Sequence, residues 1–198
     1  MIEEPSTKKW LHESGFNCIA VNMPGTTMSA IDLWCKAGSF FEGPGEEGLA
    51  HFLEHMVFKG SSELKEGEFD LKIESLGGIS NAATGYDEVH YYVVIPSDQL
   101  LKALNLLGNL IFNPLLEKQS FDLEKEVVLE EIAQHNDNPE EIIFQRLLEN
   151  CWQKQPYGRP ILGISDSINQ ITIKQMRRFH NRYYTADNIT LSIAGNLP

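Results

Sequence analysis

The stretch His51-Phe52-Leu53-Glu54-His55 decides how this chain can fold and which chemistry it can carry. It lies in a segment without proline that is rich in helix-forming residues and has apolar residues at helical spacing. Because side chains four residues apart share one face of a helix, we expect the imidazoles of His51 and His55 to point the same way. Two neutral imidazoles there can bind one divalent ion, and zinc suits a set of nitrogen and oxygen ligands.

Glu54 borders the same helical face, between the two histidines. We expect it to hold a zinc-bound water and to take its proton. The competing interpretation is structural, because a single histidine on an apolar helix is usually a satisfied core residue and a single glutamate is usually solvated. Burying three polar side chains without partners would cost about 1–3 kcal/mol each. The pattern therefore favours a metal site.

The order H-x-x-E-H is that of inverzincins, the reverse of the zincin order. Together with its surroundings it resembles the pitrilysin and mitochondrial-processing-peptidase family of insulinase-like, M16-like zinc metallopeptidases. The segments that carry the resemblance are WCKAGS at 34–39, GLAHFLEHMVFKG at 48–60 and GGISNA at 77–82. It spans essentially the whole chain and implies the N-terminal catalytic domain of a zinc-dependent endopeptidase.

Composition limits the other classes of function. The chain has 198 residues, 42% of them hydrophobic and 22% charged, with a formal net charge of −12. This charge argues against a nucleic-acid or anionic-membrane partner, and no apolar run is long enough to span a bilayer. The three cysteines are widely spaced, which predicts a reducing compartment, and the polar N-terminus has no secretory signal. We therefore expect a cytoplasmic protein.

Residues 1–198 are expected to form a single domain. The patterns of turn residues and hydrophobic spacing predict strands and helices in alternating groups. The expected strands are 17–23, 28–37, 79–85, 89–95 and 189–194, and the expected helices are 46–58, 66–76, 96–107, 118–135, 139–152 and 172–183. This order predicts an α+β two-layer domain. The resemblance implies a mixed, mainly antiparallel sheet with helices packed on one face, as in processing-peptidase-like metallohydrolases.

A catalytic zinc ion usually takes a third protein ligand. The candidates downstream are Glu124, Glu126, Glu130, Glu131, His135 and Cys151. In the helix 118–135, Glu124 and Glu131 share a face with Val127 and Val128, and helix geometry favours Glu131 over Glu130 only modestly. The resemblance implies that Glu131 is the third ligand and that Glu124 orients ligands or tunes the site.

The resemblance also implies a peptide-binding strand that begins at Asn81-Ala82. In the family this strand is a sheet edge that receives the substrate as an added strand, so that main-chain hydrogen bonds supply the affinity. The Asn81 amide can pair with a peptide group near the scissile bond, although a turn or capping asparagine is an equally ordinary interpretation. Gly85 and Tyr86 stand where family members often carry serine and a basic residue, which leaves the specificity of the cleft open.

Family enzymes pair such a domain with a second, homologous domain or subunit that completes a closed chamber. We expect the chain to be a fragment of such a protein and to be inactive or weakly active alone. Two alternatives remain. The first is a non-catalytic scaffold or partner subunit of the same fold. The second is a metalloenzyme like the S-ribosylhomocysteine lyases, which share the H-x-x-E-H helix but use a cysteine ligand, here Cys151.

Overall fold

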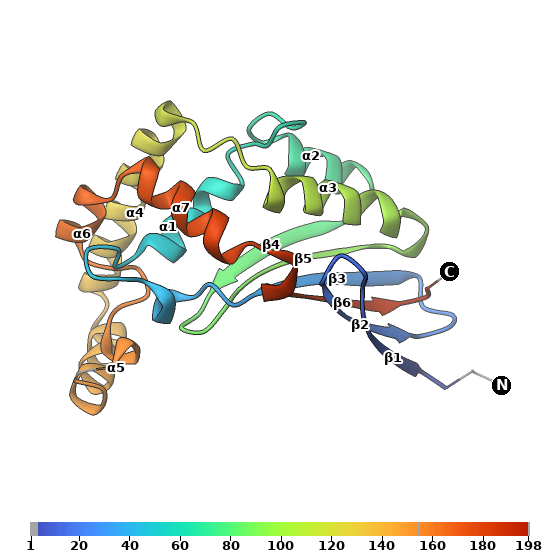
Figure 1. The fold of residues 1–198 in the computed structure, drawn as a ribbon, viewed down its shortest axis with the longest axis horizontal. Coiled ribbons are helices and arrows are strands. Elements are labelled where there is room, and N and C mark those ends of the chain that lie inside the picture. Colours follow the sequence, from blue (N-terminus) through green and yellow to red (C-terminus); the bar gives the residue numbers. More distant parts are fainter. Residues whose placement is uncertain (1–3, 154, 198) are drawn as a thin grey trace.

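A six-stranded sheet organises the chain, with its strands in the spatial order β1-β2-β6-β3-β5-β4 (Figure 1). The structure is a computed structural model that describes residues 4–153 and 155–197. The strands are β1 (Ser6–Leu11), β2 (Asn17–Asn22), β3 (Met28–Cys35), β4 (Ile79–Thr84), β5 (Val89–Pro96) and β6 (Ile189–Gly195). Only β2 and β6 pair in parallel, and the other neighbours are antiparallel. The sheet is therefore mixed and mainly antiparallel, as expected.

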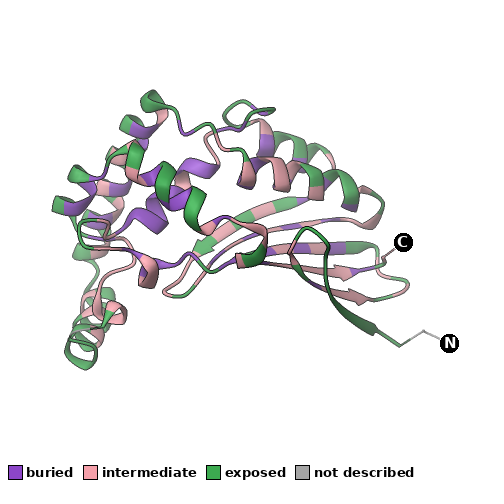
Figure 2. Ribbon diagram, in the orientation of Figure 1, coloured by how far each residue is buried: buried purple, intermediate pink, exposed green. Residues whose placement is uncertain are grey.

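The helices lie on one face of this sheet, and the other face is left open (Figure 1). They are α1 (Leu49–Val57), α2 (Glu68–Ser75), α3 (Leu100–Phe112), α4 (Lys118–Asp137), α5 (Pro139–Cys151), α6 (Ser165–Gln170) and α7 (Ile173–Tyr183). Helix α5 has no buried residue and projects away from the others (Figures 1 and 2). No helix among the described residues is both long and apolar enough to cross a membrane. The α+β, two-layer prediction is confirmed.

Alternating burial along β3 and β5 separates the two faces of the sheet. In β5, burial alternates residue by residue, with Tyr91 and Val93 fully buried toward the helices. Their neighbours His90 and Tyr92 lie on the open face and are partly exposed. An antiparallel sheet can have one face packed on a core and one face free, because successive side chains point to opposite sides. The open face of the sheet is thus available for contacts outside the core.

Two elements were not expected from the sequence. Strand β1 is fully exposed and reads STKKWL, so it lacks the alternating apolar residues that identify a strand. It forms because its backbone pairs with β2 at the edge of the sheet. Helix α6 has only six residues, mostly polar, in a stretch for which no helix was expected.

Helix boundaries also differ from the expected ones. The first helix starts at Leu49 rather than near residue 46, because Gly48 has a φ of 90° and a helix cannot continue through that conformation. A short 3-10 turn at Ser97–Gln99 precedes α3, which runs past Leu107 to Phe112 and ends at Asn113-Pro114, the break that the sequence indicates.

Helices α1 and α4 pack together through aromatic side chains. The rings of Phe52 and Phe121 lie 4.8 Å apart between centroids, and both residues are buried. Val128, two helix turns further along the same side of α4, is also fully buried. This apolar contact fixes the distance between the helix that carries His51 and His55 and the helix that carries Glu131.

We expect Phe52→Ala to lower the free energy of unfolding by about 3–5 kcal/mol, because truncation of a fully buried phenylalanine leaves a cavity between α1 and α4. Phe144→Ala is the matched control, since Phe144 lies on α5 with 60% of its surface exposed, and it should change stability by about 0.5 kcal/mol or less. Urea titration followed by circular dichroism measures both. Equal effects of the two substitutions would contradict the packing described here.

Candidate metal centre and active site

The start of α1 is fixed by a buried carboxylate and by close backbone contact. Glu42 is 5% exposed, and its two oxygens accept hydrogen bonds from the Gly48 and Ala50 amides at 3.1 and 2.8 Å. A Cβ on Gly48 would come within 2.5 Å of the Leu162 carbonyl oxygen, so only glycine fits there. Arg159 donates hydrogen bonds to the carbonyls of Ser39 and Glu42. The first turn of the helix, which leads into His51, is therefore held from both sides.

His51, His55 and Glu131 bring three metal-binding atoms together. The two Nε2 atoms are 3.2 Å apart. Oε2 of Glu131 lies 3.6 Å from Nε2 of His51 and 3.5 Å from Nε2 of His55. Among the described residues this is the group of histidine, cysteine and acidic side chains that can hold a metal ion. Helix spacing places the histidines together, and the packing of α4 brings in the carboxylate.

The tautomer of His55 follows from its neighbour Glu124. Nδ1 of His55 lies 2.9 Å from Oε1 of Glu124, and the other carboxylate oxygen lies 2.6 Å from Nζ of Lys59. Burial alone would raise the pKa of Glu124, but the hydrogen bonds from Lys59 and His55 outweigh it, and the pKa is lowered. An ionised carboxylate only accepts hydrogen bonds, so Nδ1 of His55 carries a proton, and Nε2 is the ring nitrogen that faces His51 and Glu131.

Burial keeps the His51 imidazole in its neutral form. It is 7% exposed, and burial, followed by the nearby charge of His55, lowers its pKa to about 3. Its Nδ1 atom is buried without a hydrogen-bond partner. The two rings therefore meet through their Nε2 atoms, and a proton or a cation has to lie between these atoms to make the contact favourable.

The spacing of the three atoms fits a zinc ion. With Zn–N and Zn–O bonds of about 2.0–2.2 Å, the edge of a tetrahedral site is about 3.3–3.6 Å. The observed edges are 3.2, 3.5 and 3.6 Å. Two neutral imidazoles and one carboxylate also form a donor set that zinc commonly takes in catalytic sites, where a fourth position stays open.

Glu54 lies beside this group and is held by Thr84. The Thr84 hydroxyl donates a 2.5 Å hydrogen bond to Oε2 of Glu54. Burial raises the pKa of Glu54, and the hydrogen bond from Thr84 and the charge of His55 partly offset that rise. Glu54 and His55 line a hollow of about 320 Å³ that extends to Phe58 and Asn81. A proton acceptor thus borders a cavity next to the candidate metal ligands.

Asn81 and Ala82 lie on β4, one of the two edge strands of the sheet. The amide of Ala82 donates to the side-chain oxygen of Asn81 at 2.9 Å, which leaves the Asn81 NH₂ group for another partner. The strand continues to the turn at Gly85 and Tyr86, where the Tyr86 ring packs against Tyr157 at 5.6 Å between centroids. Tyr86, one of these two turn residues, therefore contacts an aromatic side chain of this chain.

The other candidates lie away from the three metal-binding atoms. Glu126 and Glu130 are exposed on α4, and His135 pairs with Glu141 at 2.8 Å. Cys151 is exposed at the end of α5 and does not belong to the cluster among the described residues. Val127 was expected on a buried face, but it is 48% exposed because only Val128 points into the core.

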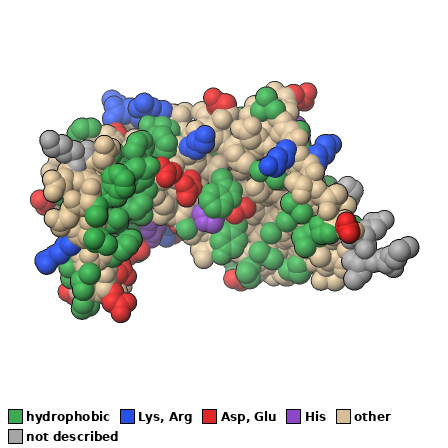
Figure 3. Space-filling view, turned by 90° about the horizontal axis from the view of Figure 1, so that it is seen from below, with side chains coloured by type: hydrophobic (Ala, Val, Ile, Leu, Met, Phe, Trp, Pro, Cys, Tyr) green, Lys and Arg blue, Asp and Glu red, His purple; other side chains and the backbone are tan. Residues whose placement is uncertain are grey.

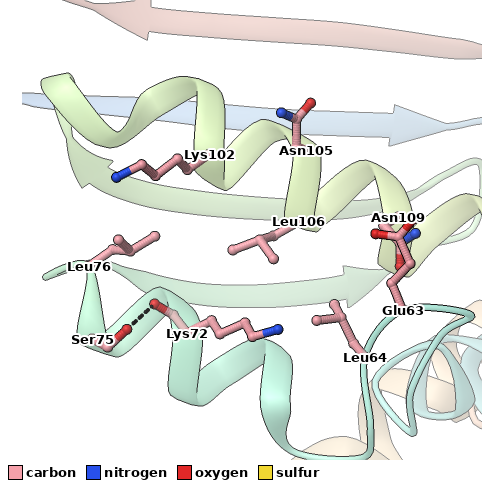
Figure 4. A pocket seen from close by; sticks show the side chains of 9 residues that line it. All are labelled: Glu63, Leu64, Lys72, Ser75, Leu76, Lys102, Asn105, Leu106 and Asn109. Atoms are coloured by element: carbon pink, nitrogen blue, oxygen red, sulfur yellow. Dashed lines mark hydrogen bonds between the residues drawn. The ribbon is translucent and has the colours of Figure 1, made fainter.

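A larger hollow, of about 410 Å³, lies between α2 and α3 (Figure 4). Its lining includes Lys72, Lys102 and Leu106, and it contains none of the residues expected in the site.

Several contacts of the site were not found from the sequence. Lys59 lies one helical turn after His55, so its position on the same face could have indicated a partner for Glu124. Thr84 and Glu42 gave no such signal, because each reaches α1 from a separate element. Local spacing therefore identifies the site residues that share one helix, and the tertiary structure is needed to identify the contacts from other elements.

Residues 18–165 match the model of a family described as Insulinase (Peptidase family M16). A relative from Rickettsia bellii, described as an uncharacterized zinc protease, is 37% identical over 93% of this chain and 45% of its own length. The beta subunit of the human mitochondrial-processing peptidase is 32% identical over all of this chain and 40% of its own length. The chain thus spans less than half the length of these curated relatives.

Two solved structures superpose closely on this chain. A protease from Helicobacter pylori superposes with a TM-score of 0.93 at 30% identity, over 98% of this chain and 47% of that one. A domain from Pseudomonas fluorescens, described as a peptidase M16 inactive domain, superposes at 0.91 over 98% of this chain and 47% of that one. Its identity is 23%, so it supports the fold alone.

We expect Glu124→Gln to weaken Zn²⁺ binding about 10- to 100-fold, because a partner that orients a metal-bound histidine commonly contributes that much to affinity. Competition with a chromophoric chelator measures the change. Glu126→Gln removes the same charge from an exposed position on the same helix and should leave the affinity within about twofold. If both variants bind zinc as the unsubstituted protein does, Glu124 does not orient a ligand.

Proposed function

The chain belongs to the insulinase-like M16 peptidase family, and we propose that it is the zinc-binding catalytic domain of a metalloendopeptidase that cleaves peptides or unfolded segments. Membership rests on the family match over residues 18–165 and on the zinc protease relatives. Beyond family membership, we propose which residues of this chain bind the metal, which metal they bind and which substrate is cleaved.

One observation carries the proposal: Nε2 of His51, Nε2 of His55 and Oε2 of Glu131 converge at tetrahedral spacing from two separate helices. A purely structural cluster would not need two imidazoles that face each other through their Nε2 atoms with one ring oriented by Glu124. We propose that His51, His55 and Glu131 hold one zinc ion. Since Cys151 is not part of this group, no observation favours a cysteine-ligated lyase.

A bound zinc ion would polarise the substrate carbonyl and increase the acidity of a water molecule. The chain's own part is proton transfer and orientation. Thr84 donates to Oε2 of Glu54, so we assign proton uptake from the attacking water to Oε1. Glu54 then passes this proton to the nitrogen of the leaving amine. Glu124 keeps the His55 ring in one tautomer, with Lys59 holding the far side of the carboxylate.

We propose that the substrate binds in an extended conformation along β4. This strand is the edge of the sheet next to the hollow that Glu54 and His55 line. An added strand would form main-chain hydrogen bonds with little dependence on sequence. The free NH₂ group of Asn81 is placed to bind a carbonyl of the peptide, next to the backbone of Ala82.

The relatives are more than twice as long as the aligned region. We therefore propose that a second, homologous domain or subunit completes the substrate chamber. In this account the present chain supplies the metal ligands and the proton acceptor, and the partner encloses the peptide.

Glu54→Gln should keep zinc bound but lower the rate of peptide cleavage by about 10²–10⁴, the usual contribution of a general base. The measurement is cleavage of a fluorogenic peptide by the full-length protein, together with zinc content by atomic absorption. Glu130→Gln, at an exposed position on α4, is the control and should cleave normally. Wild-type turnover by Glu54→Gln would remove this residue from the mechanism.

Comparing the isolated chain with the full-length protein distinguishes a peptidase from a non-catalytic scaffold subunit of the same fold. We expect the isolated chain to bind one zinc ion but to cleave poorly, and the full-length protein to cleave at least tenfold faster, because a closed chamber orients the peptide and excludes water. The same fluorogenic assay measures both. If the full-length, zinc-loaded protein has no activity on any unfolded peptide tested, the scaffold interpretation replaces the catalytic one.

A further inference from the structure

The hollow between α2 and α3 plays no part in the proposed mechanism. Its volume of about 410 Å³ nevertheless exceeds the volume of about 320 Å³ beside the candidate metal ligands. Two lysines line it, Lys72 from α2 and Lys102 from α3. Figure 4 shows three leucine side chains, Leu76, Leu106 and Leu64, in a row between the two helices. We refer to the space lined by these five residues as the α2–α3 hollow.

The leucine row gives the hollow an elongated apolar floor. Leu64 is 3% exposed, and Leu76 and Leu106 are half-buried and pack against the hydrophobic core. Along α3 the lining extends from Lys102 to Asn109, which is about 10.5 Å at a rise of 1.5 Å per residue. A straight alkyl chain of about eight carbon atoms, with C–C bonds of about 1.5 Å, has a similar length. The floor therefore suits a linear aliphatic group.

The charges that border this floor are mainly positive, although the chain as a whole has a formal net charge of −12. Neither Lys72 nor Lys102 pairs with a carboxylate among the described residues. Nζ of Lys102 donates to Oε1 of Gln99 at 2.8 Å, and its other two N–H groups are left for a ligand. Figure 4 shows the two lysine side chains extending along the hollow in opposite directions, one from each helix. Since Glu63 is the only acid among the described lining residues, the charge balance favours an anion.

On the open side of the sheet, exposed aromatic side chains border an acid instead. His90 forms a stacked ladder with Trp34 and Tyr92, at 4.3 and 5.8 Å between ring centroids, and Nδ1 of His90 lies 3.1 Å from Asp32. Figure 3 looks at the molecule from below and shows hydrophobic and acidic side chains together near the middle of this side. The charge of Asp32 opposes the binding of a carboxylate at this ladder. Of these two surfaces, the α2–α3 hollow is therefore the one that suits an aliphatic anion.

We propose that the α2–α3 hollow is a binding site for a medium-chain aliphatic carboxylate, such as octanoate. The alkyl chain lies along the leucine row, and the ammonium groups of Lys72 and Lys102 attract the carboxylate from the two helices. Glu63, which is exposed and also lines the hollow, weakens the binding through its negative charge. The inference does not depend on the proposed function, because none of the lining residues belongs to the candidate metal centre.

The test is isothermal titration calorimetry on the full-length, zinc-loaded protein at neutral pH. The probes are octanoate, octanamide, which has nearly the same shape without the charge, and hexanoate, which is two methylene groups shorter. We expect octanoate to bind about tenfold more tightly than octanamide, because hydrogen bonds to charged groups contribute more than neutral ones. Octanoate should bind about 4- to 16-fold more tightly than hexanoate, since each methylene group removed from water contributes about two- to fourfold.

The double substitution Lys72→Gln and Lys102→Gln should weaken octanoate binding about tenfold, because it removes both positive charges but keeps the leucine row. Glu63→Gln should instead strengthen the binding about twofold. The control, Lys174→Gln with Arg178→Gln, removes two charges from exposed positions on α7 and should leave the affinity within about twofold, because distant surface charges are screened. Thermal unfolding checks that each variant is folded.

Two results would overturn the site and leave the peptidase proposal intact. The first is equal affinity for octanoate and octanamide. The second is octanoate binding that is unchanged when Lys72 and Lys102 are both substituted, as expected if the carboxylate bound the zinc ion instead.

Discussion

The packing of α1 against α4 is the constraint on which the rest of the site depends. Two histidines on one helix share a face by local geometry, but a third ligand has to come from a distant part of the chain. The buried rings of Phe52 and Phe121 hold the two helices at a fixed separation, and this places a carboxylate of α4 opposite the imidazoles of α1. The packing of these two phenylalanine rings therefore determines whether the metal-binding side chains of α1 and α4 can meet.

Charges around the candidate metal centre are arranged in connected pairs. Lys59 neutralises Glu124, which in turn orients His55, and Glu42 accepts from the amides at the start of the same helix. The buried charge of Glu124 therefore has a partner, which it needs because an unpaired charge in a low-dielectric interior is costly. Glu54 has a weaker set of partners, chiefly the hydroxyl of Thr84, and burial raises its pKa. A carboxylate of this kind is suited to exchanging a proton.

The sequence was sufficient for the fold class and for the helix with His51 and His55, because both follow from periodicity and local spacing. Geometry alone did not separate Glu131 from Glu130, and the family resemblance was needed to favour one of them. Strand β1 and helix α6 were missed since they form through tertiary pairing rather than a local hydrophobic pattern. The stacked ladder of the open face joins β3 and β5, which are separated by more than fifty residues, so no local motif could have indicated it.

X-ray absorption at the zinc edge tests the central claim most directly, because it reports the atoms bound to the metal in the folded chain. The account predicts one zinc ion per chain with only nitrogen and oxygen neighbours at about 2.0–2.2 Å, including two imidazole rings. The signal from one ring should disappear in His55→Ala. Sulfur scattering near 2.3 Å, or two imidazole rings that remain after that substitution, would show that the metal is held elsewhere and would contradict the account.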